Sequence, residues 1–317
     1  MPDEQNQKQR LHQEKQGDSA ALSASTMTVA TVIVLVFAKA VAVAYSGSAA
    51  VLSALIDSIS DIGLSLMTLL AIRWSMKPAD EDHRYGHGKI EGIAALLQAA
   101  FLIGGGSFLL MEAMGRFIHP VIIQNHIFTL FLMGLSVILS GLISFIQKMA
   151  VKKSGSLALE ADSLHYSSDI AINGAVFLVV FADYMNWTAQ WLDPLCALAV
   201  AGLMANAAYK IAAKSFDMLM DKELSTEIRS KIIAITRSHP EVMGLHDLRT
   251  IQSGTRYLIS FDIELDPSML LWSAHEITRE IEKAILAEYP QSEIMIHVDP
   301  YGDTEDSRHI GKKAEAT

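Results

Sequence analysis

The chain has 317 residues, a formal net charge of -10, 51% hydrophobic residues and a positive mean hydropathy. The negative net charge and the lack of a dense Lys/Arg patch argue against a nucleic-acid partner, because nucleic-acid-binding proteins neutralise phosphates with basic side chains. The sequence contains one cysteine, Cys196. It therefore has neither a disulfide framework nor a thiolate metal site within one chain, and any metal ion must be bound by His, Asp and Glu.

The apolar residues are concentrated in one part of the chain, between Met27 and Ala213. We therefore expect a transmembrane domain over residues 26–213, followed by a cytoplasmic domain over residues 214–302 that is long enough to hold a core. Residues 1–25 are rich in Gln, Lys, Asp and Glu and lack the apolar region of a secretory signal, so we expect a disordered cytoplasmic tail there. Residues 303–317 are expected to form a second disordered tail.

Six apolar segments are long enough to cross a bilayer core of about 30 Å, which takes roughly 20 residues. We place them at residues 26–45, 49–74, 90–117, 126–151, 156–184 and 191–211. Lys and Arg gather around the second and fourth connections and after the sixth segment. The positive-inside rule then predicts that both termini lie in the cytoplasm.

Two pairs of ionisable residues with helical spacing lie inside these segments. Asp57 and Asp61 are four residues apart in the second, and His165 and Asp169 are four apart in the fifth, so each pair shares one helix face. An unpaired carboxylate at this depth costs from a few to more than ten kcal/mol. Three carboxylates and one imidazole suit Zn²⁺ and also admit Fe²⁺, Cd²⁺ or Mn²⁺. The alternative is a polar pair that stabilises helix packing, which Ser or Asn would do at lower cost.

The charged residues of the apolar segments also include Lys39 and Asp162. Lys39 is near the opposite end of the first segment, so we expect its side chain to extend to the membrane interface. Asp162 is close to the cytoplasmic end of the fifth segment, and we expect it to face water.

These pairs and the motifs around them resemble the cation diffusion facilitator family, in particular its bacterial zinc and ferrous-iron exporters of the FieF or YiiP type. The resemblance covers nearly the whole chain after the N-terminal tail. Its motifs are Ser-Gly-Ser at 46–48, the acidic pair at 57–61, Pro-Ala-Asp at 78–80, His-Arg-Tyr-Gly-His-Gly-Lys at 83–89, Glu-Ala-Asp-Ser-Leu-His at 160–165 and His-Asp-Leu-Arg-Thr at 246–250.

The resemblance implies a transport site made of Asp57, Asp61, His165 and Asp169. Manganese-type members typically carry aspartate in place of the histidine, so we expect zinc as the first substrate and ferrous iron as the second. The fourth connection is short and lacks the His-rich loop of many eukaryotic relatives. This favours a multi-pass protein of a bacterial inner membrane.

The second connection carries Asp80, His83 and His87, which match a second, more exposed metal site in the family. The Glu that follows the first His in the metalloprotease motif is absent. The alternative to a metal site is that His83 and His87 are ordinary solvent-exposed residues of the loop. Lys89 and Asp221 match two charged residues of the family that form a salt bridge, here called the charge interlock, between the membrane and cytoplasmic parts. The alternative is an exposed surface salt bridge that contributes less than about 1 kcal/mol to stability.

The cytoplasmic domain is predicted to have the order α-β-β-α-β. Helix-period stretches cover 226–239 and 271–289, and strands are expected at 243–252, 256–265 and 293–299, with a hairpin at Ser253-Gly254. This order resembles the small metallochaperone-like domain through which the family dimerises. The predicted fold class is thus an all-α six-helix transmembrane domain plus a small cytoplasmic α+β domain.

Five residues of this domain match metal-binding positions of the family, and ordinary surface residues are the alternative. They are His246, Asp262, His275, His297 and Asp299. Asp262 departs from the exporters, which have histidine there. A carboxylate in place of an imidazole keeps a ligand but weakens the preference for zinc over harder cations.

The function implied is a proton-coupled antiporter that exports divalent transition-metal ions from the cytoplasm, not an enzyme. Its partners would be divalent metal ions, protons, the lipid bilayer and a second copy of the chain, with no nucleic acid. Two alternatives stay open. One is a membrane-anchored metal sensor or scaffold that binds metal through the cytoplasmic domain. The other is an intramembrane metallohydrolase, which four protein ligands disfavour because they leave no open position for water.

Overall fold

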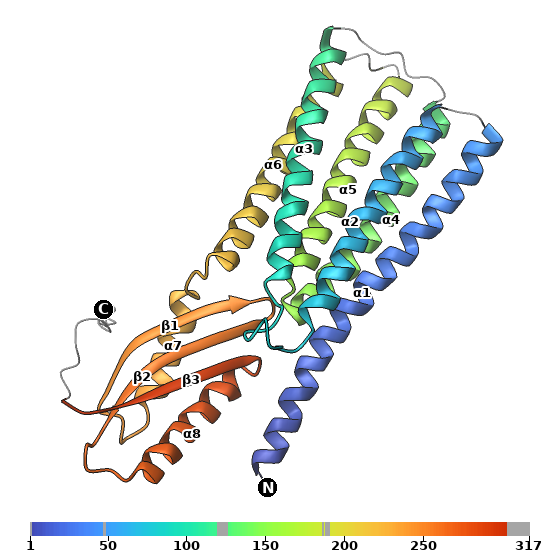
Figure 1. Ribbon diagram of the computed structural model, residues 1–317. Coiled ribbons are helices and arrows are strands. Elements are labelled where there is room, and N and C mark those ends of the chain that lie inside the picture. The colour runs from blue at the N-terminus through green and yellow to red at the C-terminus, as the bar shows by residue number, and fades with distance from the viewer. Residues whose placement is uncertain (1, 47–48, 119–125, 186, 188–190, 303–317) are drawn as a thin grey trace.

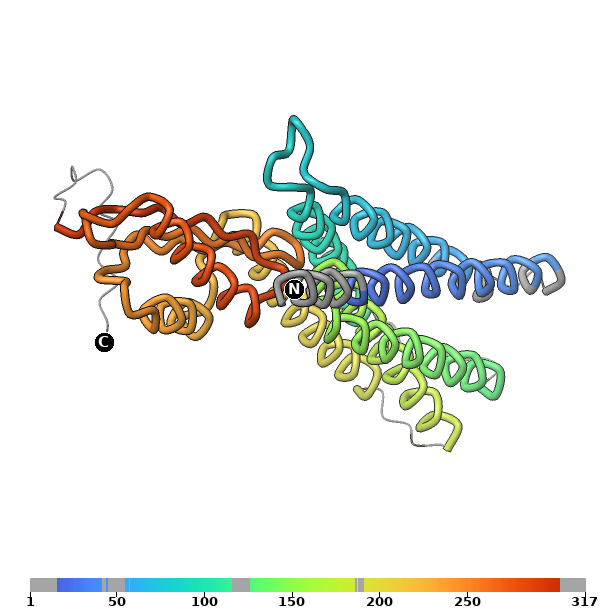
Figure 2. Tube along the Cα trace, turned by 90° about the horizontal axis from the view of Figure 1, so that it is seen from below, coloured from blue at the N-terminus to red at the C-terminus, as the bar shows by residue number. Residues whose placement is uncertain are grey.

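The computed structural model describes residues 2–46, 49–118, 126–185, 187 and 191–302. Within these ranges, the side chains of residues 2–15, 42–43, 45–46, 49–54, 57 and 116–118 lie outside the description. The chain forms a bundle of long helices joined to a smaller α+β domain (Figure 1). Viewed from below, the α+β domain extends to one side and the helices to the other (Figure 2).

In the described part of the chain, the bundle consists of six helices. They are α1 (Pro2–Ser46), α2 (Ala49–Ser75), α3 (Ile90–Ile118), α4 (His126–Ser154), α5 (Leu157–Tyr184) and α6 (Leu192–Leu219). Among the described residues, five of them contain stretches long and apolar enough to cross a membrane: 16–41 in α1, 90–115 in α3, and all of α4, α5 and α6. α2 is 27 residues long and runs beside them (Figure 1). Its crossing of the membrane remains a prediction.

The N-terminal helix differs from the expected disordered tail. α1 begins at Pro2, and its first part extends past the ends of the other helices beside the α+β domain (Figure 1). Ala21 and Ala24 are only 2% and 4% exposed and join a buried cluster with Ile72 and Leu159. The expectation of a tail over residues 2–25 was therefore wrong. The reason is that Gln, Lys, Glu and Ala favour helix, and small residues let α1 pack closely against its neighbours.

The turn between α4 and α5 determines how the site-bearing helix enters the bundle. Gly155 has φ +71°, a conformation that L side chains rarely adopt, and it follows directly after α4. Ser156 then caps α5, since its side chain accepts a hydrogen bond from the backbone N–H of Leu159. This short connection makes α4 and α5 antiparallel neighbours with extensive contact.

The α+β domain contains α7 (Thr226–Arg237), β1 (Gly244–Ser253), β2 (Arg256–Leu265), α8 (Leu271–Glu288) and β3 (Ser292–Pro300). The sheet order is β1-β2-β3, with β1 antiparallel and β3 parallel to β2. The predicted α-β-β-α-β order is confirmed. α6 continues to Leu219, beyond the expected domain boundary at 213/214, because Ser215 and Met218 are still buried in the bundle.

The sheet has one apolar face and one polar face. Ile259, Phe261 and Ile263 alternate along β2 and pack against α7 and α8 in a single buried core. The residues between them point to the opposite face, because successive side chains of a strand alternate. The polar face carries the histidines and carboxylates discussed below.

Candidate metal centres

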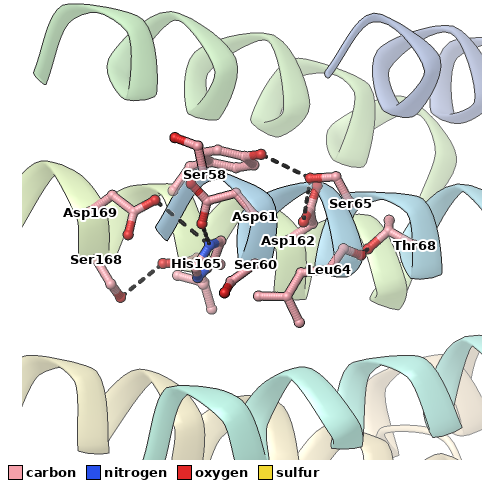
Figure 3. Close-up of polar contacts among 12 residues, drawn as sticks. Ser58, Ser60, Asp61, Leu64, Ser65, Thr68, Asp162, His165, Ser168 and Asp169 are labelled. Carbon is pink, nitrogen blue, oxygen red and sulfur yellow. Dashed lines mark hydrogen bonds and ion pairs between the residues drawn. The ribbon is translucent and has the colours of Figure 1, made fainter. Parts of the chain in front are cut away.

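The central cluster joins two helices of the bundle. The Nε2 atom of His165 on α5 lies 3.1 Å from Oδ1 of Asp61 on α2, and 3.7 Å from Oδ2 of Asp169 on α5. The His165 side chain is 9% exposed, and those of Asp61 and Asp169 are 25% and 21% exposed. Their ligand atoms all lie within 4.8 Å of one another (Figure 3). Such a cluster has the donor set and the compactness that a divalent transition metal requires.

Asp57 belongs to the predicted site, but its side chain lies outside the described residues. Its backbone is in α2, one turn before Asp61. Its part in the site remains a prediction.

Lys39 does not extend to the membrane interface as expected. Its Nζ atom donates a 2.6 Å hydrogen bond to Oγ of Ser58, which lies on α2 between Asp57 and Asp61. α1 and α2 are in close contact, so the ammonium group finds an oxygen on the neighbouring helix at this depth.

Asp162 also departs from expectation. Instead of facing water, it is 0% exposed, and its Oδ2 atom accepts a 2.5 Å hydrogen bond from Nε2 of Gln147 on α4. The cause is the close packing of α4 on α5 after the Gly155 turn, which covers the first two turns of α5.

The second connection brings its three predicted residues together. Oδ1 of Asp80 lies 3.2 Å from Nδ1 of His83, and Oδ2 of Asp80 lies 3.3 Å from Nε2 of His87. The two imidazole rings are 4.5 Å apart. The backbone N–H of His83 donates to Asp80 over 2.7 Å, and this bond lowers the pKa of the exposed carboxyl. Asp80 is therefore ionised and ready to coordinate a cation over a wider pH range than an ordinary aspartate.

Lys89 and Asp221, the residues of the predicted charge interlock, form a salt bridge. Nζ of Lys89 lies 2.7 Å from Oδ1 of Asp221, with side chains 39% and 48% exposed. Lys89 precedes α3 and Asp221 follows α6, so the pair connects the ends of two helices that pack together. Asp221 has φ +55°, and aspartate is one of the few residues other than glycine that tolerate this region.

The polar face of the sheet carries the third cluster. The Nδ1 atom of His246, on β1, lies 3.6 Å from Oδ2 of Asp262. The Nε2 atom of the same ring lies 3.4 Å from Oδ2 of Asp299. His297 is bonded to the same Asp299 carboxylate at 2.9 Å. Burial raises the pKa of the Asp262 carboxyl above its ordinary value. The nearby His246 lowers this pKa in part, and the negative charge of Asp299 raises it further.

His275 does not join this cluster. It is exposed on α8, whose buried residues Ala274, Ile277 and Ile281 face the apolar side of the sheet. His246 and Asp262 lie on the opposite side. The sheet therefore separates His275 from the other four residues within one chain.

The sequence analysis missed Glu264. Its Oε1 atom lies 3.5 Å from Nε2 of His246, which adds a third carboxylate to the polar face. The signal was present in β2, because Asp262 and Glu264 are two residues apart and so point to the same side of a strand.

Comparison with known proteins agrees with this architecture. A family model described as the cation efflux transmembrane domain matches residues 25–220, which is more than half of the chain. The chain belongs to the cation efflux family. A second family model, the cytoplasmic domain of cation efflux proteins, matches residues 224–301.

Two curated members of the cation efflux family are similar over most of the chain. The cation-efflux pump FieF of Shewanella oneidensis is 38% identical over 256 residues, which cover 81% of this chain and 86% of that protein. FieF of Escherichia fergusonii is 36% identical over 256 residues, covering 81% and 85%. Because the family consists of efflux pumps, the chain is a transporter and not an enzyme.

A solved structure is also similar, the metal-bound C-terminal domain of the CzcD transporter from Thermotoga maritima. It is 36% identical, covers 25% of this chain and 93% of that one, and has a TM-score of 0.24.

Proposed function

We propose that this cation efflux protein exports a divalent transition-metal ion from the cytoplasm of a bacterium in exchange for protons, with zinc as the first substrate and ferrous iron as the second. The observation that carries the proposal is the cluster of Asp61, His165 and Asp169. It joins α2 to α5 inside the helical bundle. Asp57 would complete the donor set from one turn away on α2.

The choice of metal follows from the donors. One imidazole among carboxylates suits an ion of intermediate softness such as Zn²⁺ or Fe²⁺, whereas Mg²⁺ and Ca²⁺ prefer oxygen ligands alone. The cytoplasmic cluster likewise places three carboxylates around His246, and His297 contacts one of them. It would therefore accept the same class of ions as the central cluster.

Exchange for protons follows from competition for the same atoms. A bound metal ion needs a neutral His165 and ionised carboxylates, whereas protons occupy those same positions when the ion has left. An inward-facing site would load metal and release protons. An outward-facing site, in contact with a more acidic exterior, would take up protons and release the metal. This alternation requires two arrangements of the helices with different affinities for the ion.

Two features of the assembly belong to the same proposal. The Lys and Arg residues at the second and fourth connections support cytoplasmic termini. The match of residues 224–301 to the cytoplasmic domain of cation efflux proteins supports a homodimer formed through that domain.

The test is metal flux in proteoliposomes that hold a metal-sensitive dye and an imposed pH gradient. We expect Zn²⁺ uptake that depends on the gradient, and at least about a hundredfold slower uptake by Asp61→Ala, since losing a charged ligand costs several kcal/mol. Equal uptake by Asp61→Ala would refute the site. Metal binding without any flux by the unaltered protein would favour the sensor or scaffold instead.

A further inference from the structure

A second buried polar site lies next to the central cluster, around Asp162. Asp162 and Gln147 are both 0% exposed. Oδ2 of Asp162 accepts from Nε2 of Gln147 at 2.5 Å, and Oδ1 accepts from Oγ of Ser65 at 3.5 Å (Figure 3). Within the described part of the chain, no Lys or Arg side chain forms an ion pair with Asp162. The hydrogen bonds to this deeply buried carboxyl come from neutral donors only, so a nearby cation or a proton must offset its charge.

The groups around Asp162 offer oxygen atoms to a metal ion. Oε1 of Gln147 is buried and has no hydrogen-bond partner, while Nε2 of the same amide also reaches Oγ1 of Thr28 at 3.2 Å. A half-turn of the amide would exchange its oxygen and nitrogen, which are nearly the same size. The amide oxygen would then point at the position where a cation bound to Asp162 must lie. Carboxylate, amide and hydroxyl oxygens are ligands that divalent cations accept.

This second site is connected to the first along both helices. Asp162 precedes His165 by one turn on α5, and Ser65 follows Asp61 by one turn on α2. The Ser65 hydroxyl also lies 2.8 Å from the Tyr166 hydroxyl. The two sites therefore succeed each other along the α2–α5 contact, and Asp162 lies nearer the end of the bundle that adjoins the α+β domain, because α5 begins there at Leu157 (Figure 1).

We propose that Asp162 and Gln147, with Thr28 and Ser65, form a relay site that holds the divalent metal ion on its way to the central cluster. The proposal rests on the proposed export function, in which the ion enters from the cytoplasm. One carboxylate with neutral oxygens binds a divalent ion more weakly than three carboxylates with an imidazole. The ion is therefore held long enough to lose water and then moves on to the stronger site, as conduction through successive sites requires.

A purely structural role would not need this side chain. Asparagine or serine hydrogen-bonds between helices within a membrane at much lower cost than a buried carboxylate. Asn in place of Asp162 keeps the shape and can still bond to Ser65 and, after a turn of the amide, to Gln147. Asp162→Asn thus removes the charge while keeping the packing, which makes it the decisive variant.

The experiment measures Zn²⁺ entry into proteoliposomes at limiting zinc, together with equilibrium zinc binding to the purified protein. For Asp162→Asn we expect at least about a tenfold lower initial rate, equivalent to about 1.4 kcal/mol, with a zinc dissociation constant at the central site within about twofold of the unaltered protein. Gln147→Leu should lower the rate in the same direction. Ser144→Ala is the matched control, because Ser144 is a buried residue of α4 whose hydroxyl bonds to Ser167 and to the backbone oxygen of Ser163 on α5 rather than to the Asp162 carboxylate. Its rate should stay unchanged.

Three results would overturn the relay site. One is an unchanged rate in Asp162→Asn. Another is a parallel loss of rate, zinc affinity and thermal stability, which would mean that Asp162 supports the helices only. The last is a normal zinc rate whose dependence on pH has disappeared, which would assign Asp162 to protons. If the unaltered protein moves no metal at all, the export function itself fails, and that outcome is distinct from these three.

Discussion

Gly88 and Gly254 meet backbone to backbone. A Cβ atom on Gly254 would lie 3.0 Å from Cα of Gly88, and a Cβ on Gly88 would lie 2.4 Å from the carbonyl oxygen of Ser253. Gly88 directly follows His87 of the second-connection cluster, and Gly254 forms the β1–β2 turn with φ +63°. The loop that carries Asp80, His83 and His87 therefore rests on the hairpin of the cytoplasmic domain with no room for a side chain.

The first prediction concerns this contact. Gly88→Ala forces the loop and the hairpin apart, so we expect a loss of stability of about 1–3 kcal/mol, the usual cost of overpacking a closed site. Thermal unfolding of the purified protein measures it. The control is Gly104→Ala, because Gly104 lies in α3 with nothing within 4 Å of an added Cβ. Alanine there should be tolerated, and an identical melting temperature for Gly88→Ala and the unaltered protein would count against the contact.

The second prediction concerns Lys89 and Asp221. Because both side chains are more than one third exposed, the pair should stabilise the fold by less than about 1 kcal/mol. Its larger effect should be on metal flux, since it connects α3 to the end of α6. We expect Lys89→Gln and Asp221→Asn each to slow zinc transport, and the double variant to be no slower than either single one. Asn is chosen because it tolerates the positive φ of position 221. Strictly additive losses would show that the two residues act independently.

The sequence predicted the elements of the fold well, because periodicity reports directly on helices and strands. The four-residue spacing of His165 and Asp169 correctly placed both on one face of α5. Strand alternation likewise predicted β1 and β2, which bring His246 and Asp262 together in the structure. Both patterns are local, so tertiary packing did not have to be known.

Three of the failures depended on packing between distant segments. Asp162 was expected to face water because it is near the end of a helix, yet Gln147 of α4 and Ser65 of α2 enclose it. Lys39 was expected to reach the interface, yet Ser58 of α2 accepts its hydrogen bond. The tail over residues 2–25 was misjudged from its polar composition, since composition does not show that Ala21 and Ala24 have a partner surface.

The third prediction concerns metal selectivity. His165→Asp replaces the imidazole of the central cluster with a carboxylate and leaves oxygen ligands only. We expect the ratio of Zn²⁺ to Mn²⁺ transport to fall by about tenfold or more, because harder ligands suit the harder ion. Parallel flux assays with the two metals measure the ratio. His165→Gln is the matched control, since it removes the imidazole without adding charge and should lower transport of both metals. An unchanged ratio in His165→Asp would mean that selectivity lies elsewhere in the chain.

The fourth prediction concerns Asp262 and the pH dependence of the cytoplasmic domain. Burial raises the pKa of Asp262 in the folded state above its unfolded value, so the folded domain retains a proton there at higher pH than the unfolded chain. This group therefore favours folding most at low pH, and its contribution is lost as the pH rises through the raised pKa. At neutral pH the metal-free domain carries an unfavourable charge, which a bound cation would offset. Asp262→Asn should accordingly stabilise the metal-free domain at neutral pH.

The same variant should weaken stabilisation by metal. A cation at a hundred times its dissociation constant adds about 2.7 kcal/mol to the folded state, and Asp262→Asn should remove most of that gain. Asp266→Asn is the matched control, because Asp266 lies outside the cluster and accepts bonds from the backbone N–H and hydroxyl of Ser268, which lower its pKa. Its contribution is present at neutral pH and lost as the pH falls, so Asp266→Asn should destabilise the metal-free domain while leaving the zinc-induced shift intact. Thermal unfolding from below pH 3.8, the ordinary pKa of both carboxyls, up to neutral pH measures the two pH dependences, and zinc added at neutral pH separates the two variants. A full zinc-induced shift in Asp262→Asn would show that His246 and Asp299 bind the ion without this carboxylate.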